Sequence, residues 1–185
     1  MGVLNITPDS FSDGGLFLNP EAALKQAGQL IAAGADMLDI GAESTRPGAA
    51  VLDVAEEHAR LMPVLESVLD AYDIAVSVDT YKPEIMEAAV LRGAACINDV
   101  FALQKPGALE MAAKLDVPVC LMHMLGTPET MQLGLDEADD VMSRIQAFFE
   151  ARVAAAQAAG IRKTQLILDP GFGFGKTVEQ NLRMT

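Results

Sequence analysis

The chain has 185 residues, of which 51% are hydrophobic and 21% are charged, which excludes a disordered chain and suits one domain with a buried core. It carries 13 Lys and Arg against 26 Asp and Glu, and the net charge of −13 argues against non-specific binding to nucleic acid. The sequence contains no apolar run of about 18 residues and no secretory leader pattern, so we expect no membrane span and no export.

Short apolar runs alternate with longer helical patterns along the chain. The runs are rich in leucine and β-branched residues and mostly apolar throughout, as expected for strands buried on both faces. In chain order, we predict strands over residues 2–6, 36–40, 74–78, 95–98, 119–122 and 166–168, and helices over 20–33, 54–71, 83–92, 107–115 and 138–159. This alternation predicts a parallel β/α architecture in a single domain over residues 1–185.

A polar side chain stands at or beside the carboxyl end of every predicted strand. These residues are Asn5, Asp39, Asp79, Asn98, His123 and Asp169. In a closed β/α barrel the carboxyl ends of all strands converge on one face, where active sites are built, whereas an open doubly wound sheet binds its ligand at one crevice. Polar groups at every strand end therefore favour the barrel.

Residues 169–177 form a glycine-rich segment that superficially resembles two nucleotide-binding motifs. A P-loop requires glycine where this chain has Pro170, which offers no N–H to a phosphate, and the G-x-G-x-G spacing does not match a dinucleotide fingerprint. The glycines instead predict positive φ angles and a close approach of the backbone, either to a flat ligand or within a tight turn.

Two polar loops follow the first two predicted strands. The loop over residues 7–15 combines hydroxyls and carboxylates with an aromatic side chain, Phe11, and a Gly-Gly pair, as a mobile lid does. The loop over residues 43–48 carries Arg46, whose guanidinium can bind a phosphate or a carboxylate through two donors. On spacing alone, each loop fits either a ligand contact or a solvated turn.

Asp79, Asn98 and Asp169 are the candidate binding set. Two carboxylates and an amide can bind a flat heterocycle with adjacent N–H and C=O groups. Because a buried Asp without a partner is costly, these positions predict a ligand or a strong internal partner. We expect His123 to be a packed, hydrogen-bonded core residue and His58 to be exposed, and no Ser-His-Asp or Cys-His nucleophile set is found.

The two cysteines, Cys96 and Cys120, lie far apart in the sequence without a C-x-x-C pattern, and we expect them to be reduced core residues of a cytoplasmic protein. The two histidines are too few and too scattered for a zinc site.

The motifs of this chain are similar to those of the dihydropteroate synthase family. The opening segment 1–15 and the segment 39–48 resemble the two most specific family signatures, with Ala42 where the family usually has glycine. Segments 77–80, 97–99, 121–124 and 168–176 continue the resemblance in order, so that it covers essentially the whole chain.

The resemblance implies a (β/α)8 TIM barrel and a transferase of folate biosynthesis that is a sulfonamide target. Such an enzyme joins 6-hydroxymethyl-7,8-dihydropterin diphosphate to p-aminobenzoate and releases diphosphate. The resemblance assigns Asp79, Asn98 and Asp169 to hydrogen bonds with the pterin. It assigns the lining of the pterin pocket to Met122, Gly173 and Phe174.

The remaining residues implied by the resemblance surround the diphosphate and the p-aminobenzoate. Asn5 would carry Mg2+ and the diphosphate. Thr45 and Arg46 would lie in the second loop near both groups. Contacts with the p-aminobenzoate ring would come from Phe11 and Pro47, and Asp13 would help to order the first loop.

The chain also departs from the family. About six of eight β/α units are expected, and the Ser-Arg-Lys and Arg-x-His motifs of the last two strands are absent, which leaves Arg46 and Lys176 as cationic candidates. We therefore expect a chain truncated at both ends, with residual pterin binding and little or no synthase activity alone. A homodimer, common in the family, would have part of its interface outside this sequence. Alternatives are a pterin-binding methyltransferase-type barrel and a non-catalytic fragment.

Overall fold

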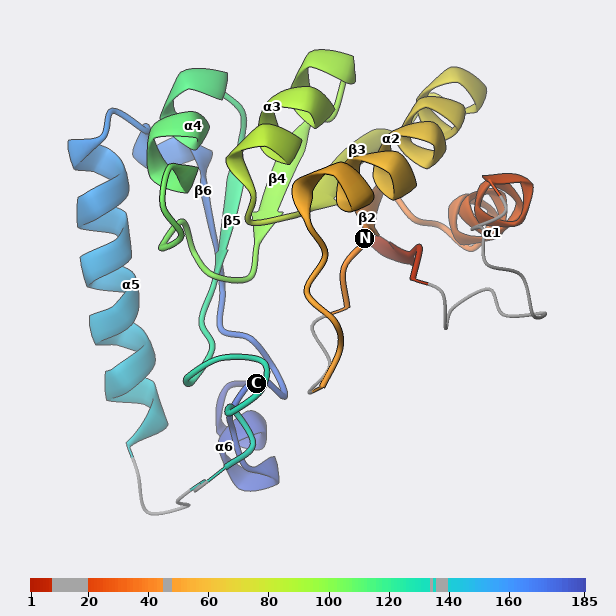
Figure 1. Ribbon diagram of the computed structural model, residues 1–185. Coiled ribbons are helices and arrows are strands. Elements are labelled where there is room, and N and C mark those ends of the chain that lie inside the picture. Colours follow the sequence, from red (N-terminus) through yellow and green to blue (C-terminus); the bar gives the residue numbers. More distant parts are fainter. Residues whose placement is uncertain (8–19, 45–47, 134, 136–139) are drawn as a thin grey trace.

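The computed structural model describes residues 1–7, 20–44, 48–133, 135 and 140–185, and its centre is a six-stranded parallel sheet (Figure 1). The strands are β1 (Gly2–Asn5), β2 (Met37–Gly41), β3 (Ala75–Asp79), β4 (Cys96–Asp99), β5 (Val119–Met122) and β6 (Leu166–Asp169). The helices are α1 (Pro20–Ala32), α2 (Val54–Ala71), α3 (Pro83–Arg92), α4 (Ala108–Leu115), α5 (Val141–Ala158), the short 3-10 helix η2 (Lys163–Gln165) and α6 (Val178–Arg183).

The sequence predicts all six strands and the first five helices, and the differences lie at their ends. Helix α5 begins at Val141 rather than at 138, because the Asp140 side chain accepts a hydrogen bond from the Ser143 N–H and caps the helix there. Residue 107 precedes α4 instead of opening it. The 3-10 helix η2 and helix α6 are not among the five predicted helices, and both are too short to show a clear hydrophobic period.

The strand order confirms the choice between the two predicted topologies. The strands lie in the order β1-β2-β3-β4-β5-β6, and each pairs in parallel with the next one along the chain. A doubly wound sheet requires a reversal of strand order, and the described strands contain none. The six β/α units therefore form an arc of a β/α barrel, with the carboxyl ends of the strands at one edge.

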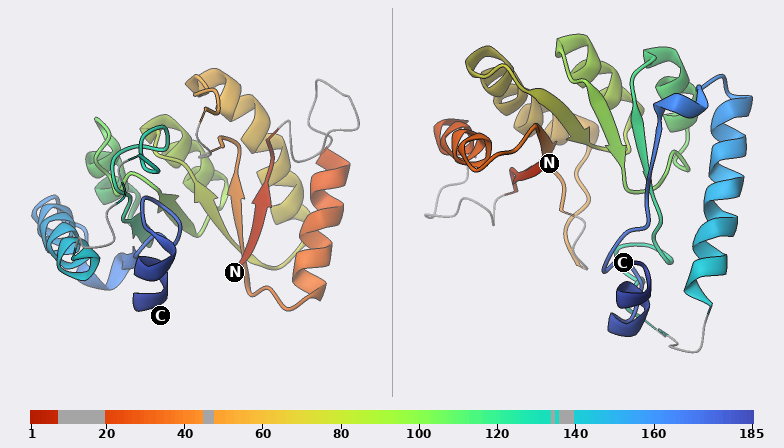
Figure 2. Two further views of the ribbon diagram at one scale, coloured as in Figure 1. Left: turned by 90° about the horizontal axis from the view of Figure 1, so that it is seen from below. Right: turned by 180° about the vertical axis from the view of Figure 1, so that it is seen from behind.

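The two faces of the sheet differ in burial. The face toward the helices carries Leu4, Ile40 and Leu121, which are fully buried. On the opposite, concave face the edge strands are open, and Val3 and Ile167 are 51% and 48% exposed. Figure 2 shows α1 to α5 around the outside of the curved sheet. The expectation that all strands are buried on both faces is therefore wrong for β1 and β6, because each is an edge strand with a neighbouring strand on one side only. Leu168, on the helix-facing side of β6, is also 45% exposed.

None of the helices within the described residues is both long and apolar enough to cross a membrane.

Candidate active site at the carboxyl ends of the strands

Asp79 and Asn98 lie side by side at the carboxyl ends of β3 and β4, where the sheet register pairs them directly. Asn98 is half-buried, and its Nδ2 donates a hydrogen bond of 3.0 Å to Oδ2 of Asp39. Burial, reinforced by the charges of Asp39 and Asp99 among others, raises the pKa of Asp79 well above its ordinary value. This carboxyl therefore holds a proton at pH values where a solvated Asp is ionised.

Gly41 leaves the space that the Asp79 side chain occupies. The register pairs Gly41 with Asp79 across β2 and β3. A methyl group at Gly41 would lie 3.2 Å from Cβ and 3.3 Å from Oδ2 of Asp79. The end of β2 therefore determines how the carboxyl of Asp79 can sit, and this close packing was not apparent from the sequence.

Asp169 ends β6 opposite Met122 of β5, so that two further predicted site residues are neighbours in the sheet. Met122 is 4% exposed, and Oδ1 of Asp169 accepts a hydrogen bond of 2.8 Å from the Gly171 N–H. Burial raises the pKa of the Cys120 thiol to about 12. The charges of Asp169, Asp39 and Asp79 contribute to this rise. The charges of the carboxylates at the strand ends therefore reach the Cys120 thiol.

The glycine-rich segment packs against the loop that follows β5. Gly171, Gly173 and Gly175 have φ angles of 69°, 80° and 71°, as the sequence predicts. A Cβ atom at Gly171 would lie 2.1 Å from the carbonyl oxygen of His123, and one at Gly175 would lie 2.4 Å from Cβ of Leu125. Gly171 and Gly175 therefore allow two loops to pack closely, which favours the tight turn over a ligand contact at these two positions. Of the three glycines, Gly173 alone has open space beside it.

Lys176 is a structural residue and not a free cation for an anion site. Its ammonium donates hydrogen bonds to the carbonyl oxygens of Gly171, Phe174 and His123 at 2.9, 3.0 and 3.2 Å. The side chain is buried, and this burial lowers the pKa of Lys176 to about 8. The expectation that Lys176 could serve the anion site is therefore wrong, because three backbone carbonyls already use its donors.

His123 is buried as predicted, but its ring is held by packing rather than by hydrogen bonds at both nitrogens. The imidazole is edge-on to Phe148 at a centroid distance of 4.9 Å, and Nδ1 is buried with no hydrogen-bond partner among the described residues. Burial, helped by the charges of Lys176 and Arg144, lowers the pKa of His123 to about 4. The ring is therefore neutral at pH 7.

A buried ion cluster, which the sequence analysis did not single out, ties together the loops after β2 and β3. Lys82 Nζ lies 2.6 Å from Glu43 Oε2 and also contacts the carboxylate of Glu57. Thr80 Oγ1 donates a 2.7 Å hydrogen bond to Glu57, and the Tyr81 hydroxyl donates one of 2.8 Å to Glu43. The available sequence signal was the charge of Glu43, Glu57 and Lys82, and charge alone does not distinguish an exposed side chain from one in a buried ion pair.

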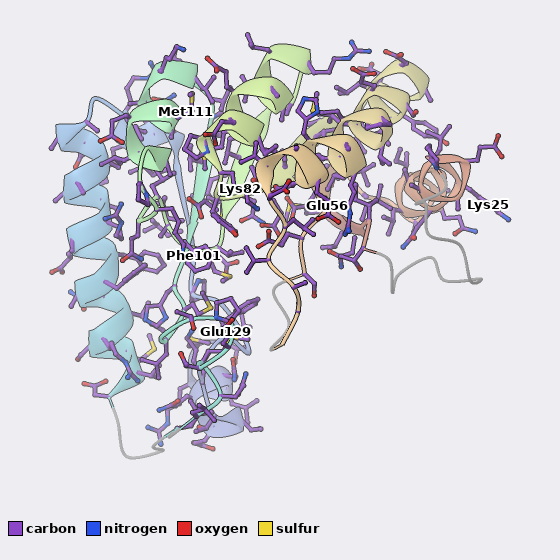
Figure 3. All side chains as sticks on the ribbon, in the orientation of Figure 1. Lys25, Glu56, Lys82, Phe101, Met111 and Glu129 are labelled. Atoms are coloured by element: carbon purple, nitrogen blue, oxygen red, sulfur yellow. The ribbon has the colours of Figure 1, made fainter. Side chains whose placement is uncertain are left out.

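A small pocket lies beside this cluster, at the same end of the sheet, and Glu43 and Tyr81 belong to both. Its volume is about 220 Å³, and its lining includes an edge-to-face pair of Tyr81 and Phe101 with ring centroids 4.8 Å apart. Lys105 Nζ lies 4.1 Å from the centre of the Phe101 ring. Figure 3 shows Phe101 and Glu129 on the loops at this edge. The lining residues are Glu43, Ser44, Ala49, Val51, Tyr81, Phe101, Lys105, Thr127, Pro128 and Glu129.

The other predicted site residues divide into two groups. Asn5 ends β1, where its side chain is exposed, and Phe174 is half-buried next to the glycine-rich turn. The predicted loop residues Phe11, Asp13, Thr45, Arg46 and Pro47 lie outside the described residues. Their roles remain predictions.

Known proteins resemble this chain over almost its whole length. The pterin binding enzyme family matches residues 1–185. The dihydropteroate synthase of Escherichia coli (strain K12) is 49% identical over 181 residues, which are 98% of this chain and 64% of that protein.

Solved structures agree with this relationship. A dihydropteroate synthase of Yersinia pestis with a sulfonamide drug has a TM-score of 0.91 and 49% identity over 99% of this chain and 66% of that one. For a dihydropteroate synthase of Xanthomonas albilineans with 4-aminobenzoic acid, the TM-score is 0.89 at 49% identity over 99% of this chain and 64% of that one. The chain thus spans about two thirds of the length of the relatives that it matches.

Proposed function

The chain belongs to the pterin binding enzyme family, and we propose that it carries the substrate sites of a dihydropteroate synthase, with little or no activity of this chain alone. Such an enzyme is a transferase that joins 6-hydroxymethyl-7,8-dihydropterin diphosphate to p-aminobenzoate and releases diphosphate. One observation carries this proposal. The ends of β3, β4 and β6 present Asp79, Asn98 and Asp169 at one edge of the sheet, in a chain that is 49% identical to dihydropteroate synthases.

The chemistry of these three side chains suits a pterin. A pterin ring offers adjacent N–H donors and a carbonyl acceptor in one plane. Asp79, with its raised pKa, can accept a hydrogen bond and also donate one, and Asn98 can do both at any pH. Met122 would lie against the ring as an apolar neighbour, together with the predicted pocket residues Gly173 and Phe174. Hydrogen bonds to such a site can hold the ring in one orientation.

We also propose Mg2+ as the metal of this reaction, with Asn5 as its protein ligand. The Asn5 amide oxygen is a hard donor exposed at the same end of the sheet. Among the described residues, no group of three or more His, Cys, Asp or Glu could hold a metal. One amide oxygen fits Mg2+, which usually keeps several waters and takes its other ligands from phosphates. When bound, the ion would supply charge stabilisation to the leaving diphosphate.

The second substrate would bind at the two loops that follow β1 and β2. Arg46 and Thr45 would face the diphosphate and p-aminobenzoate, while Phe11 and Pro47 would contact the ring and Asp13 would order the first loop. The support is the sequence of these loops together with the 4-aminobenzoic acid in the structure of the Xanthomonas albilineans relative. We also propose a cytoplasmic location, which the free thiols of the two cysteines support. A homodimer is part of the same proposal.

Calorimetry with 6-hydroxymethyl-7,8-dihydropterin tests the pterin site. We expect the chain to bind this pterin, and Asp79→Ala and Asn98→Ala each to weaken binding by about 10-fold or more, since each removes a hydrogen bond to the ligand. The matched surface variant Asp70→Ala should bind as the unmodified chain does, because Asp70 is an exposed residue of α2 that pairs with Arg92, away from the strand ends. A folded chain that binds no pterin would refute the proposal, as would unchanged affinity in both site variants.

A second titration distinguishes the transferase from the methyltransferase-type alternative. The chain is first saturated with the pterin, diphosphate and Mg2+, and then titrated with p-aminobenzoate. A dihydropteroate synthase binds p-aminobenzoate under these conditions. Pterin binding without any binding of p-aminobenzoate would favour the methyltransferase-type barrel instead.

A further inference from the structure

Asp39 is a buried acid that lies beneath the candidate site. It belongs to β2 and is only 5% exposed. Its Oδ2 accepts the hydrogen bond from Asn98 Nδ2, while its Oδ1 has no hydrogen-bond partner among the described residues. Burial raises the pKa of Asp39, and the Ser77 and Asn98 side chains oppose that rise. Burying a carboxyl group with one oxygen lacking a hydrogen bond costs free energy of folding. We therefore expect this side chain to serve a function.

The sheet register places Asp39 two residues below the level of Asp79 and Asn98. Asp39 pairs with Ser77 of β3, whereas Asp79, two residues further along that strand, pairs with Asn98. Successive inward-facing residues of a strand form successive layers inside a β/α barrel. Asp39 therefore lies one layer below Asp79 and Asn98, and it reaches a ligand through Asn98.

The chemistry of the contact determines which way the Asn98 amide faces. A carboxylate can only accept hydrogen bonds, so it requires the NH2 group of Asn98 and repels the carbonyl oxygen. With Nδ2 held by Asp39, Oδ1 of Asn98 is directed away from this carboxylate. Without this contact, the Asn98 amide could rotate by 180° at little cost and exchange its oxygen and its NH2 group. A ligand would then face an acceptor in some molecules and a donor in others.

We infer that Asp39 is a positioning residue for ligand recognition, which holds the Asn98 amide with its carbonyl oxygen available to an N–H group of a planar heterocycle. The identity of that heterocycle as a pterin rests on the proposed function. The orientation of the amide does not, because it follows from the contact between two side chains of this chain.

A double-mutant cycle on pterin affinity tests the inference. Asp39→Ala should weaken binding of 6-hydroxymethyl-7,8-dihydropterin by about 10-fold, and Asn98→Ala by at least as much. The double variant should bind no more weakly than Asn98→Ala, since Asp39 acts only through Asn98. Losses that multiply in the double variant would overturn the inference, because they would mean that Asp39 acts on the ligand independently.

Two matched variants separate positioning from a general effect on folding. Asp39→Asn keeps the volume and an acceptor oxygen for Asn98, so it should bind within about threefold of the unmodified chain. Ser77→Ala removes the hydroxyl beside Asp39 but keeps the hydrogen bond between Asp39 and Asn98, so it should bind within about threefold of the unmodified chain. A loss in Ser77→Ala equal to that in Asp39→Ala would contradict the inference. If Asp39→Ala fails to fold, Asp39→Leu keeps the volume of the side chain and removes the hydrogen bond.

Nuclear magnetic resonance of the Asn98 side-chain amide provides a readout that needs no ligand. In the unmodified chain, the Nδ2 proton that faces Asp39 should be shifted relative to its partner, and Asp39→Ala or Asp39→Leu should remove this difference while Asp39→Asn retains it. Unchanged Asn98 signals in Asp39→Leu would refute the inference. If the unmodified chain shows the shift but binds no pterin, the proposed function fails while the positioning contact stands.

Discussion

The ammonium of Lys82 lies 2.6 Å from Oε2 of Glu43, which joins the start of α3 to the loop after β2. The same ammonium contacts the carboxylate of Glu57, which is 1% exposed on the inner side of α2. Burial alone would lower the pKa of Lys82, but the hydrogen bonds and charges of Glu57 and Glu43 reverse that effect and raise it. One cation thus holds two carboxylates beneath the rim of the candidate site.

Lys82→Met should destabilise the chain strongly. The substitution keeps an apolar stem but leaves the buried Glu57 without its cation, and breaking a buried pair in this way typically costs about 3–5 kcal/mol. Urea unfolding followed by circular dichroism measures the change. The control is Lys114→Met, which removes an exposed pair with Glu87 and should cost less than about 1 kcal/mol. Similar losses in both variants would show that the Lys82 cluster contributes no more than a surface pair.

His123 should make the fold sensitive to acid. Its pKa is about 4 in the folded chain and 6.5 when unperturbed, so the unfolded state takes up the proton first. The stability that the neutral ring contributes is complete above about pH 6.5 and is lost as the pH falls toward 4, by an amount on the order of 3 kcal/mol. Thermal unfolding of the chain and of His123→Gln across this range provides the measurement. Parallel pH profiles in the two proteins would contradict the prediction.

Asp99 should produce the opposite trend. The carboxylate is fully buried and accepts hydrogen bonds from the Phe101 and Leu103 N–H groups, and burial raises its pKa from 3.8 to about 6. Its contribution to stability is complete below about pH 4 and is lost as the pH rises through 6, which amounts to about 3 kcal/mol. The free energy of unfolding relative to Asp99→Asn, which does not titrate, should therefore rise as the pH is lowered from about 6 to about 4. A constant difference would argue against this titration.

Gly171→Ala should be far more disruptive than Gly173→Ala. Both residues have positive φ angles, so each substitution carries a similar backbone penalty, about 1 kcal/mol. Only at Gly171 would the new methyl group collide with a backbone atom, the carbonyl oxygen of His123. Unfolding midpoints compare the two variants directly. Equal losses would indicate that the loop after β5 moves aside freely.

Much of the fold was predictable because its signals are local. The strand at Val119–Met122 and the helices at Val54–Ala71 and Pro83–Arg92 have the predicted bounds, since apolar runs, a capping Asp53 and a helix-opening Pro83 lie within a few residues of the ends they determine. The convergence of polar strand ends was also predictable, because parallel strands place their carboxyl ends at one edge.

The errors concern how polar groups are used, which depends on distant partners. Lys176 was expected to be available to an anion, but a loop that begins at His123 supplies one of its three acceptors. The glycines were compatible with a ligand or a turn, and the neighbouring loop after β5 decided for packing at Gly171 and Gly175.

The sequence by itself determined the order of the strands and helices, the edge where the site residues gather and the family to which the chain belongs, because these follow from patterns along the chain. Only the tertiary structure decided which polar side chains remain available to a ligand. Asp39 and Asn98 are 59 positions apart and meet through the pairing of three strands. The strength and direction of such a contact depend on distance and burial, which the sequence does not contain.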